Sequence, residues 1–118
     1  MKVLIVEDSK VTRRLLVGQC KRVAPNWEVT ESGSVDEAIA AFDRVSPELA
    51  LCDLQLEDRD GLEVIRHIRD SGKPCKIVVL TGKTAEEAQS EALASGAEMF
   101  LTKPPTADKL VEVVKRIG

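Results

Sequence analysis

Five side chains that can bind a metal ion or a phosphoryl group stand at the ends of apolar runs in this chain. They belong to Glu7, Asp8, Asp53, Thr81 and Lys103. The three carboxylates offer the oxygen ligands that a divalent ion such as Mg²⁺ prefers. The hydroxyl and the ammonium can bind the oxygens of a phosphoryl group. If these residues meet in space, the sequence predicts a site for a cation together with a phosphoryl group.

Short apolar runs alternate five times with segments of helical period, and these elements must position the five side chains. The runs 3–6, 49–52 and 77–80 are almost continuously apolar, as is typical of parallel strands covered on both faces. Residues 27–31 alternate between apolar and polar, which suits an edge strand, and residues 99–102 form the last run. Because ligand chemistry gathers at the carboxyl ends of the strands in an open α/β sheet, we expect the five side chains to converge there.

Apolar residues spaced by three and four predict the helices between these strands. Four of these segments carry clear apolar stripes, at 16–23, 35–45, 61–68 and 107–117. The remaining segment, 84–92, has only Ala85, Ala88 and Ala92 to bury, so we expect it to be held less firmly than the others. The predicted fold is one α/β domain over residues 1–118, a doubly wound five-stranded parallel sheet with five helices on both faces.

Composition excludes several classes of protein. The formal net charge of -3 and the pI near 5.2 argue against direct contact with nucleic acid, which normally requires a basic face. No apolar run approaches the roughly 18 residues of a membrane span, so we expect a cytoplasmic protein that does not enter a membrane. Cys20, Cys52 and Cys75 form no C-x-x-C pair and are expected to be free thiols.

The motifs and their order resemble the receiver domain of two-component response regulators, of the chemotaxis-regulator type. The landmarks are the acidic pair followed by Ser9, an aspartate with Asp-Gly seven and eight positions later, Thr-Gly, and an aromatic residue three positions before Lys-Pro. In this chain they are Glu7-Asp8-Ser9, Asp53 with Asp60-Gly61, Thr81-Gly82, and Phe100 with Lys103-Pro104. The resemblance covers the whole chain and implies the flavodoxin-like strand order 2-1-3-4-5.

The resemblance implies a role for each residue of the site. Asp53 would accept a phosphoryl group from a phosphohistidine on a histidine kinase or a histidine phosphotransfer protein. Mg²⁺, or Mn²⁺ in its place, would be bound by Asp8, Asp53 and the backbone carbonyl of Gln55, with Glu7 acting directly or through a water. Lys103 and Thr81 would bind phosphoryl oxygens. Such a protein is not an enzyme on other substrates, since it assists only its own phosphorylation and autodephosphorylation.

The resemblance also implies how the modification is read. Thr81 would move towards the phosphoryl group, and the ring of Phe100 would occupy the space that it leaves. The surface made by residues 84–92, 99–102 and 107–117 would then change and contact a downstream protein or an output domain. The peptide bond before Pro104 is expected to be cis.

Two residues depart from the usual pattern of the family. Glu7 replaces the commoner aspartate, which lengthens the acidic arm. Glu57 stands where the family usually has proline, and we expect a looser, more acidic loop there. Gln55 and Lys83, two positions after Asp53 and Thr81, flank the path of the attacking water in the family, but their identities assign no lifetime to the phosphoryl group.

Three other readings use the same kind of sheet. A receiver-like module that is never phosphorylated is disfavoured by the presence of Asp53, Thr81 and Lys103. A phosphatase of the haloacid dehalogenase type requires D-x-D after the first strand, where this chain has Glu7-Asp8-Ser9. A flavodoxin-type flavin site requires a neutral phosphate loop at that position, where two acids would repel the ligand.

Overall fold

The computed structural model describes residues 1–57, 59–82 and 84–117, and at positions 85, 88, 91 and 92 it describes the backbone alone. The expectations for the side chains of Ala85, Ala88 and Ala92 and for Lys83 therefore lie outside the described part of the molecule. The strands are β1 (Lys2–Val6), β2 (Glu28–Ser32), β3 (Leu49–Asp53), β4 (Lys76–Thr81) and β5 (Met99–Thr102). The helices are α1 (Lys10–Val23), α2 (Val35–Val45), α3 (Leu62–Asp70), α4 (Ala85–Ser95) and α5 (Ala107–Ile117).

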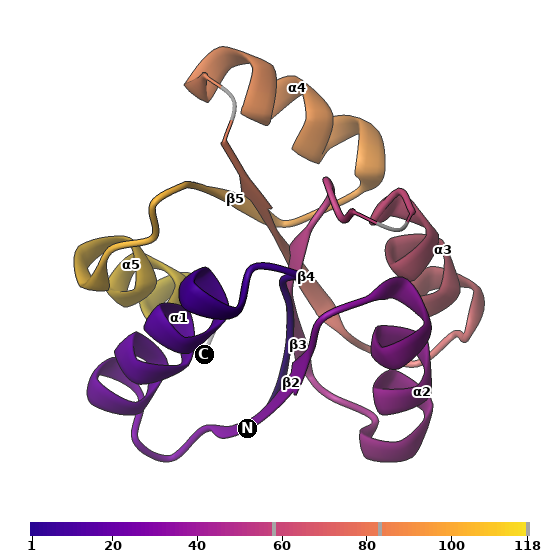
Figure 1. The fold of residues 1–118 in the computed structure, drawn as a ribbon, viewed down its shortest axis with the longest axis horizontal. Coiled ribbons are helices and arrows are strands. Elements are labelled where there is room, and N and C mark those ends of the chain that lie inside the picture. The colour runs from indigo at the N-terminus through magenta and orange to yellow at the C-terminus, as the bar shows by residue number, and fades with distance from the viewer. Residues whose placement is uncertain (58, 83, 118) are drawn as a thin grey trace.

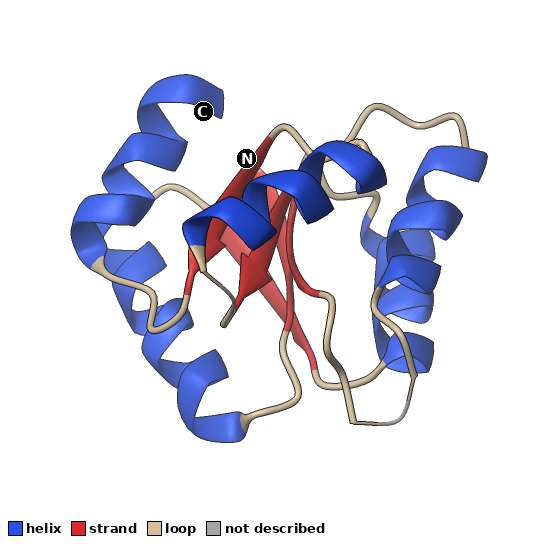
Figure 2. Cartoon of the chain, turned by 90° about the horizontal axis from the view of Figure 1, so that it is seen from above, coloured by secondary structure: helices blue, strands red, loops and turns tan. Residues whose placement is uncertain are grey.

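The strands form one five-stranded parallel sheet in the order β2-β1-β3-β4-β5, which confirms the predicted topology. β2 is an edge strand, as its alternating sequence indicated. Figure 1 shows the sheet almost edge-on, with α1 and α5 on one side and α2 and α3 on the other, and α4 beside β5. The view from above in Figure 2 shows the same arrangement of helices around the central strands.

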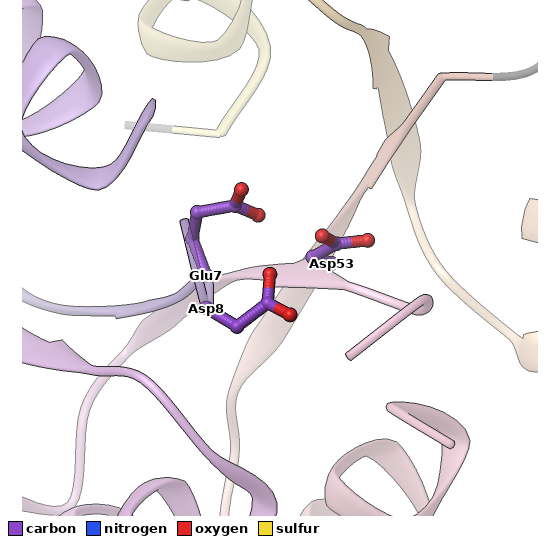
Figure 3. Close-up of side chains that lie close together, drawn as sticks. All are labelled: Glu7, Asp8 and Asp53. Carbon is purple, nitrogen blue, oxygen red and sulfur yellow. The ribbon is translucent and has the colours of Figure 1, made fainter. Parts of the chain in front are cut away.

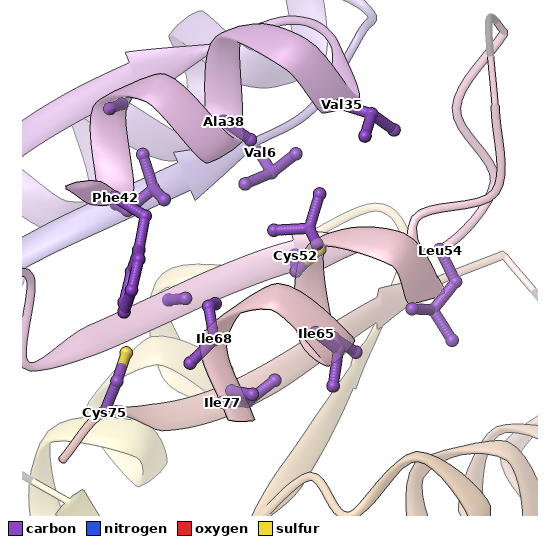
Figure 4. Close-up of a cluster of buried hydrophobic side chains, with 14 of the residues drawn as sticks. Val6, Val35, Ala38, Phe42, Cys52, Leu54, Ile65, Ile68, Cys75 and Ile77 are labelled. Carbon is purple, nitrogen blue, oxygen red and sulfur yellow. The ribbon is translucent and has the colours of Figure 1, made fainter. Parts of the chain in front are cut away.

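Each face of the sheet has its own hydrophobic core. Alternate residues of a strand point to opposite faces, so a continuously apolar strand supplies both cores. The core between the sheet and α2 and α3 includes Val6, Phe42, Cys52, Ile65 and Ile77 (Figure 4). The core under α1 and α5 includes Ile5, Leu16, Leu51, Leu101 and Leu110. The two cores hold the strands in register and so determine which residues reach the carboxyl edge of the sheet.

The start of α2 is capped by two side chains. The Ser34 hydroxyl accepts a hydrogen bond from the Glu37 N–H at 3.2 Å, and the Glu37 carboxylate accepts from the Gly33 N–H at 3.1 Å. The three cysteines are free and buried, as expected. Among the described helices, none is long and apolar enough to cross a membrane.

Candidate functional site

Three of the five side chains reach the carboxyl edge on the same side of the sheet. Glu7 follows β1, Asp53 is the last residue of β3, and Lys103 follows β5. In each case the residue two positions earlier belongs to the core under α1 and α5, namely Ile5, Leu51 and Leu101. Because residues two apart on a strand share a face, the alternation itself directs these two carboxylates and the ammonium to one side.

The Lys103 ammonium bridges the two buried carboxylates. Its Nζ lies 2.6 Å from Asp53 Oδ2 and 3.1 and 3.0 Å from Glu7 Oε1 and Oε2. Glu7 is 0% exposed and Asp53 is 2% exposed, so neither carboxylate has much water to solvate it. A buried charge is tolerated only when it is paired. Lys103 therefore partly neutralises the negative charge of the site. The peptide bond between Lys103 and Pro104 is cis, as predicted.

Asp8 completes a cluster of three carboxylates. One oxygen from each of Glu7, Asp8 and Asp53 lies within 4.8 Å of the others, and Figure 3 shows the three side chains turned towards one another. Asp8 Oδ2 also accepts a hydrogen bond from the Glu57 N–H at 2.8 Å. The donor set consists of hard, anionic oxygens from a rigid strand edge, which fits Mg²⁺ or Mn²⁺.

The loop after β3 is tied to this cluster at two points. The Gln55 N–H donates to Asp53 Oδ1 at 2.9 Å, and the Glu57 N–H holds Asp8. A proline at position 57 would have no N–H to donate, so Glu57 connects this loop to the end of β1. This bond therefore does not support the expectation that Glu57 loosens the loop. The role of the Gln55 carbonyl stays a prediction.

Gly61 closes the same loop against the end of β3. Its N–H donates to the Leu54 carbonyl at 2.9 Å, and a Cβ at this position would lie 2.2 Å from the Asp53 carbonyl oxygen. Its φ of -61° and ψ of -16° are ordinary helical values. The glycine is required because the backbone passes so close to the strand end, and not because of an unusual backbone conformation.

Thr81 and Phe100 share the opposite face of the sheet. Phe100 pairs with Val79 in the β4–β5 register, and Thr81 lies two residues after Val79. Thr81 is 3% exposed, and its carbonyl accepts a hydrogen bond from the Lys103 N–H at 2.7 Å. Phe100 is half-buried against the core under α2 and α3. Phe100 is also one of the residues that line a groove of about 470 Å³ between α4, β5 and α5, so this residue borders both the core and the surface.

The electrostatics of the site reflect an excess of negative charge. Three carboxylates and one ammonium leave a formal charge of -2 when all are ionised. Burial and the neighbouring carboxylate of Asp53 raise the pKa of Glu7 to about 7, and the Lys103 ammonium only partly opposes this rise. Burial alone would lower the pKa of Lys103, but its hydrogen bonds to Asp53 and Glu7 outweigh burial and raise it. Without a metal ion, a proton on Glu7 relieves part of the repulsion.

This raised pKa predicts how stability depends on pH. With EDTA present, the free energy of unfolding should fall by up to about 3 kcal/mol as the pH rises from about 4.5 to about 7, since folded Glu7 keeps a proton that the unfolded chain has lost. Urea unfolding at several pH values measures this slope. Glu7→Gln should flatten it, whereas the exposed-residue control Glu86→Gln should keep it. An unchanged slope in Glu7→Gln would show that Glu7 is ionised throughout this range.

Sequence reasoning did not identify several residues that support the site. The Arg13 guanidinium donates to the Glu7 carbonyl at 2.8 Å. The Lys109 ammonium donates to the carbonyl and the hydroxyl of Thr102 at 2.9 and 2.6 Å, directly before Lys103. Arg13 lies on α1 and Lys109 on α5, and charged residues on helices are usually read from sequence as solvent-exposed. Only the folded structure shows that these two contact the backbone next to the site.

Comparison with known proteins gives one consistent family. The family model of the response regulator receiver domain matches residues 3–115. Among curated proteins, the chain is 32% identical over 111 residues to the transcriptional regulatory protein TrcR and 32% identical over 118 residues to the DNA-binding transcriptional activator DevR/DosR, both of Mycobacterium tuberculosis. It is 36% identical over 104 residues to the virulence transcriptional regulatory protein PhoP of Salmonella choleraesuis.

Solved structures agree with these relatives. The chemotaxis protein CheY4 of Vibrio cholerae superposes with a TM-score of 0.87 at 25% identity, covering 99% of this chain and 98% of that one. NtrX of Brucella abortus superposes with a TM-score of 0.86 at 28% identity, covering 98% of this chain and 26% of that one. Likeness to CheY4 therefore extends over both whole chains, and likeness to NtrX over a part of NtrX.

The chain spans about half the length of the curated relatives that it matches. The matched shares of TrcR, DevR/DosR and PhoP are 42%, 54% and 46%, and they cover 94%, 100% and 88% of this chain. One of these relatives is named a DNA-binding activator. The expectation of no direct contact with nucleic acid therefore does not extend to the longer proteins that carry this domain.

Proposed function

Because the chain belongs to the family of response regulator receiver domains, we propose that it is a phosphoryl-accepting switch in which Asp53 is the acceptor. The observation that carries this proposal is the position of the Asp53 carboxylate. It is buried at the end of β3, with Oδ2 held by Lys103 at 2.6 Å and Oδ1 held by the Gln55 N–H at 2.9 Å. Two further carboxylates stand beside it. A structural ion pair needs only one of these acids.

In the proposed reaction an Asp53 oxygen attacks the phosphorus of a phosphohistidine. The P–N bond breaks, its electron pair stays on the imidazole nitrogen, and Asp53 becomes an acyl phosphate. The incoming group adds about -1.5 to -2 charges to a site that is already negative. Mg²⁺ held by Glu7, Asp8 and Asp53, with the Gln55 carbonyl, would supply the positive charge that this transfer requires.

Lys103 and Thr81 have complementary tasks in this proposal. The Lys103 ammonium, which pairs Glu7 and Asp53 in the unmodified protein, turns to a phosphoryl oxygen. The Thr81 hydroxyl donates to another phosphoryl oxygen. The backbone bond from the Lys103 N–H to the Thr81 carbonyl keeps the two residues adjacent while their side chains move. Charge-assisted hydrogen bonds of roughly 1.5–3 kcal/mol each can then drive a change of conformation.

The change is read through Phe100. The shared face of Thr81 and Phe100 and the half-buried ring support a step in which Thr81 leaves and the ring moves inward. Phenylalanine has no hydroxyl, so the readout is steric and apolar. The groove between α4, β5 and α5 changes shape as the ring leaves it, and a downstream protein or an output domain binds this surface.

The partners follow from this role. A histidine kinase or a histidine phosphotransfer protein supplies the phosphoryl group in the cytoplasm. These 118 residues carry a formal net charge of -3 and act by protein contact, so any DNA contact belongs to other parts of a longer regulator. The domain modifies itself and turns over no other substrate.

Labelling with acetyl phosphate tests the proposal. With Mg²⁺, intact-mass spectrometry should record the addition of one phosphoryl group, and peptide mapping after borohydride reduction should locate it at Asp53. With EDTA no addition should appear. Failure to label in Mg²⁺, together with failure to bind beryllofluoride, would favour the interaction module that is never phosphorylated.

The same beryllofluoride complex tests the readout. Backbone NMR signals of β5 and of the groove residues around Phe100 should shift on binding, in addition to those at the carboxyl edge. Shifts that stop at the carboxyl edge would contradict the proposed role of Phe100.

A further inference from the structure

Gln19 is a buried polar residue of α1 that the site described above does not use. It is 6% exposed, and its Nε2 donates to the Pro105 carbonyl at 2.9 Å, a contact between residues 86 positions apart. The Pro105 carbonyl can only accept, so the orientation of the amide is determined. Its other end, Oε1, is buried and has no hydrogen-bond partner among the residues that the structure describes. An unpaired buried carbonyl is unfavourable, so stability alone does not explain a glutamine here.

The segment that receives this bond follows Lys103 directly. Pro104 and Pro105 have no N–H, so this stretch of backbone cannot donate a hydrogen bond to any neighbour. Pro105 is buried, and within the described parts of the chain the bond from Gln19 is the only one that either proline accepts. Regular bonding resumes at Thr106, whose hydroxyl accepts from the Lys109 N–H at 3.3 Å.

The residue before Lys103 is held separately. Lys109 binds the carbonyl and hydroxyl of Thr102, and the Lys103 N–H binds the Thr81 carbonyl. These contacts fix the backbone on the N-terminal side of the Lys103 side chain. On its C-terminal side the hydrogen bond comes from α1, through Gln19. The lysine that reaches Glu7 and Asp53 thus stands between two anchored points.

We infer that Gln19 is a positioning residue, which anchors the Lys103-Pro104-Pro105 segment to α1 and so holds the Lys103 ammonium over the acceptor carboxylate. The inference rests on the proposed role of Lys103 in binding the phosphoryl group. An apolar side chain of the same length would fill the space and remove the unpaired carbonyl, but it would leave the segment without this hydrogen bond. The Lys103 ammonium would then be positioned less precisely, although the core stays packed.

Gln19→Met tests the inference in the protein without metal or phosphoryl group. Amide hydrogen exchange of Lys103, divided by that of the β3 core amides, should become about tenfold faster, because the local anchor is lost. The affinity for beryllofluoride in Mg²⁺ should fall about tenfold. The Tm should stay within about 2 °C of wild type, since the unpaired Gln19 carbonyl is gone while the Pro105 carbonyl loses its donor. Gln19→Leu serves as a second variant if Gln19→Met folds poorly.

Arg69→Met is the matched control, because the Arg69 side chain also donates to backbone carbonyls between elements. It binds the Cys75 and Gly96 carbonyls at 3.1 and 2.6 Å, next to the starts of β4 and β5 and thus at the opposite edge of the sheet. This variant should lower the Tm and leave the Lys103 exchange ratio unchanged.

Two results would overturn the inference. The first is that the Lys103 exchange ratio in the Gln19 variants equals that of wild type. The second is that this ratio rises in Arg69→Met as much as it does in Gln19→Met. Wild-type protein that fails to bind beryllofluoride would instead overturn the proposed function, and the exchange ratio would still decide whether Gln19 anchors the segment.

Discussion

Asp53→Asn should reduce labelling by acetyl phosphate to background while the protein stays folded. A carboxamide is too weak a nucleophile to form an acyl phosphate under these conditions. The fold should persist because the amide oxygen can still accept from the Gln55 N–H, and Lys103 keeps both oxygens of Glu7 as partners. Losing one of the three carboxylates proposed to bind Mg²⁺ should also weaken Mg²⁺ binding at least about tenfold. Mass spectrometry and a metal titration measure the two effects.

The control for this variant is Asp70→Asn, an exposed residue at the end of α3. It changes the same functional group and should label like wild type. Wild-type labelling of Asp53→Asn would mean that another residue accepts the phosphoryl group, and the assignment of the site would be wrong. Loss of labelling in both variants would mean that removing any one negative charge from the protein prevents labelling.

Gly61→Ala should destabilise the protein by at least about 3 kcal/mol and slow the labelling of Asp53 at least about tenfold. The added Cβ would lie 2.2 Å from the Asp53 carbonyl oxygen and 2.7 Å from Leu54 Cα. Both are backbone atoms, so relief requires the end of β3 or the start of α3 to move. Any such movement shifts the Asp53 carboxylate and the Gln55 N–H that orients it. Urea unfolding and the labelling rate measure the two effects.

Gly18→Ala is the matched control, since it makes the same chemical change in the exposed middle of α1. A Cβ at Gly18 meets nothing within 4 Å. The substitution should stabilise the protein by about 1 kcal/mol through helix propensity and leave labelling unchanged. If Gly61→Ala is as stable and as quickly labelled as Gly18→Ala, the close approach of Gly61 to β3 has no functional consequence.

Most of the fold could be predicted because its signals are local. Continuous apolar runs identified the buried strands, and the alternation at residues 27–31 identified the edge strand, which the structure begins at Glu28. Helical spacing located the helices, and the predicted strand order is confirmed.

The carboxyl edge could be predicted for the same reason, but its internal contacts could not. Strand ends and residue types placed Glu7, Asp8, Asp53 and Lys103 at one edge. The pattern did not reveal that one ammonium contacts both buried acids, or that the Glu57 N–H holds Asp8. Glu57 was expected to loosen its loop because it replaces the proline usual in the family, whereas in the structure its N–H, which a proline would lack, holds the loop to Asp8.

Residue types and their spacing along the chain were enough to infer the five βα units, the edge at which reactive groups gather, and the chemistry open to three acids, a hydroxyl and a lysine. These features depend on residue type and on periods of two and 3.6, which are written along the chain. The folded arrangement was needed to reveal the pairing of Lys103 with both Glu7 and Asp53, the close contact at Gly61, and the bond from Gln19 to Pro105. These depend on how packing places distant segments, and no local period encodes that placement.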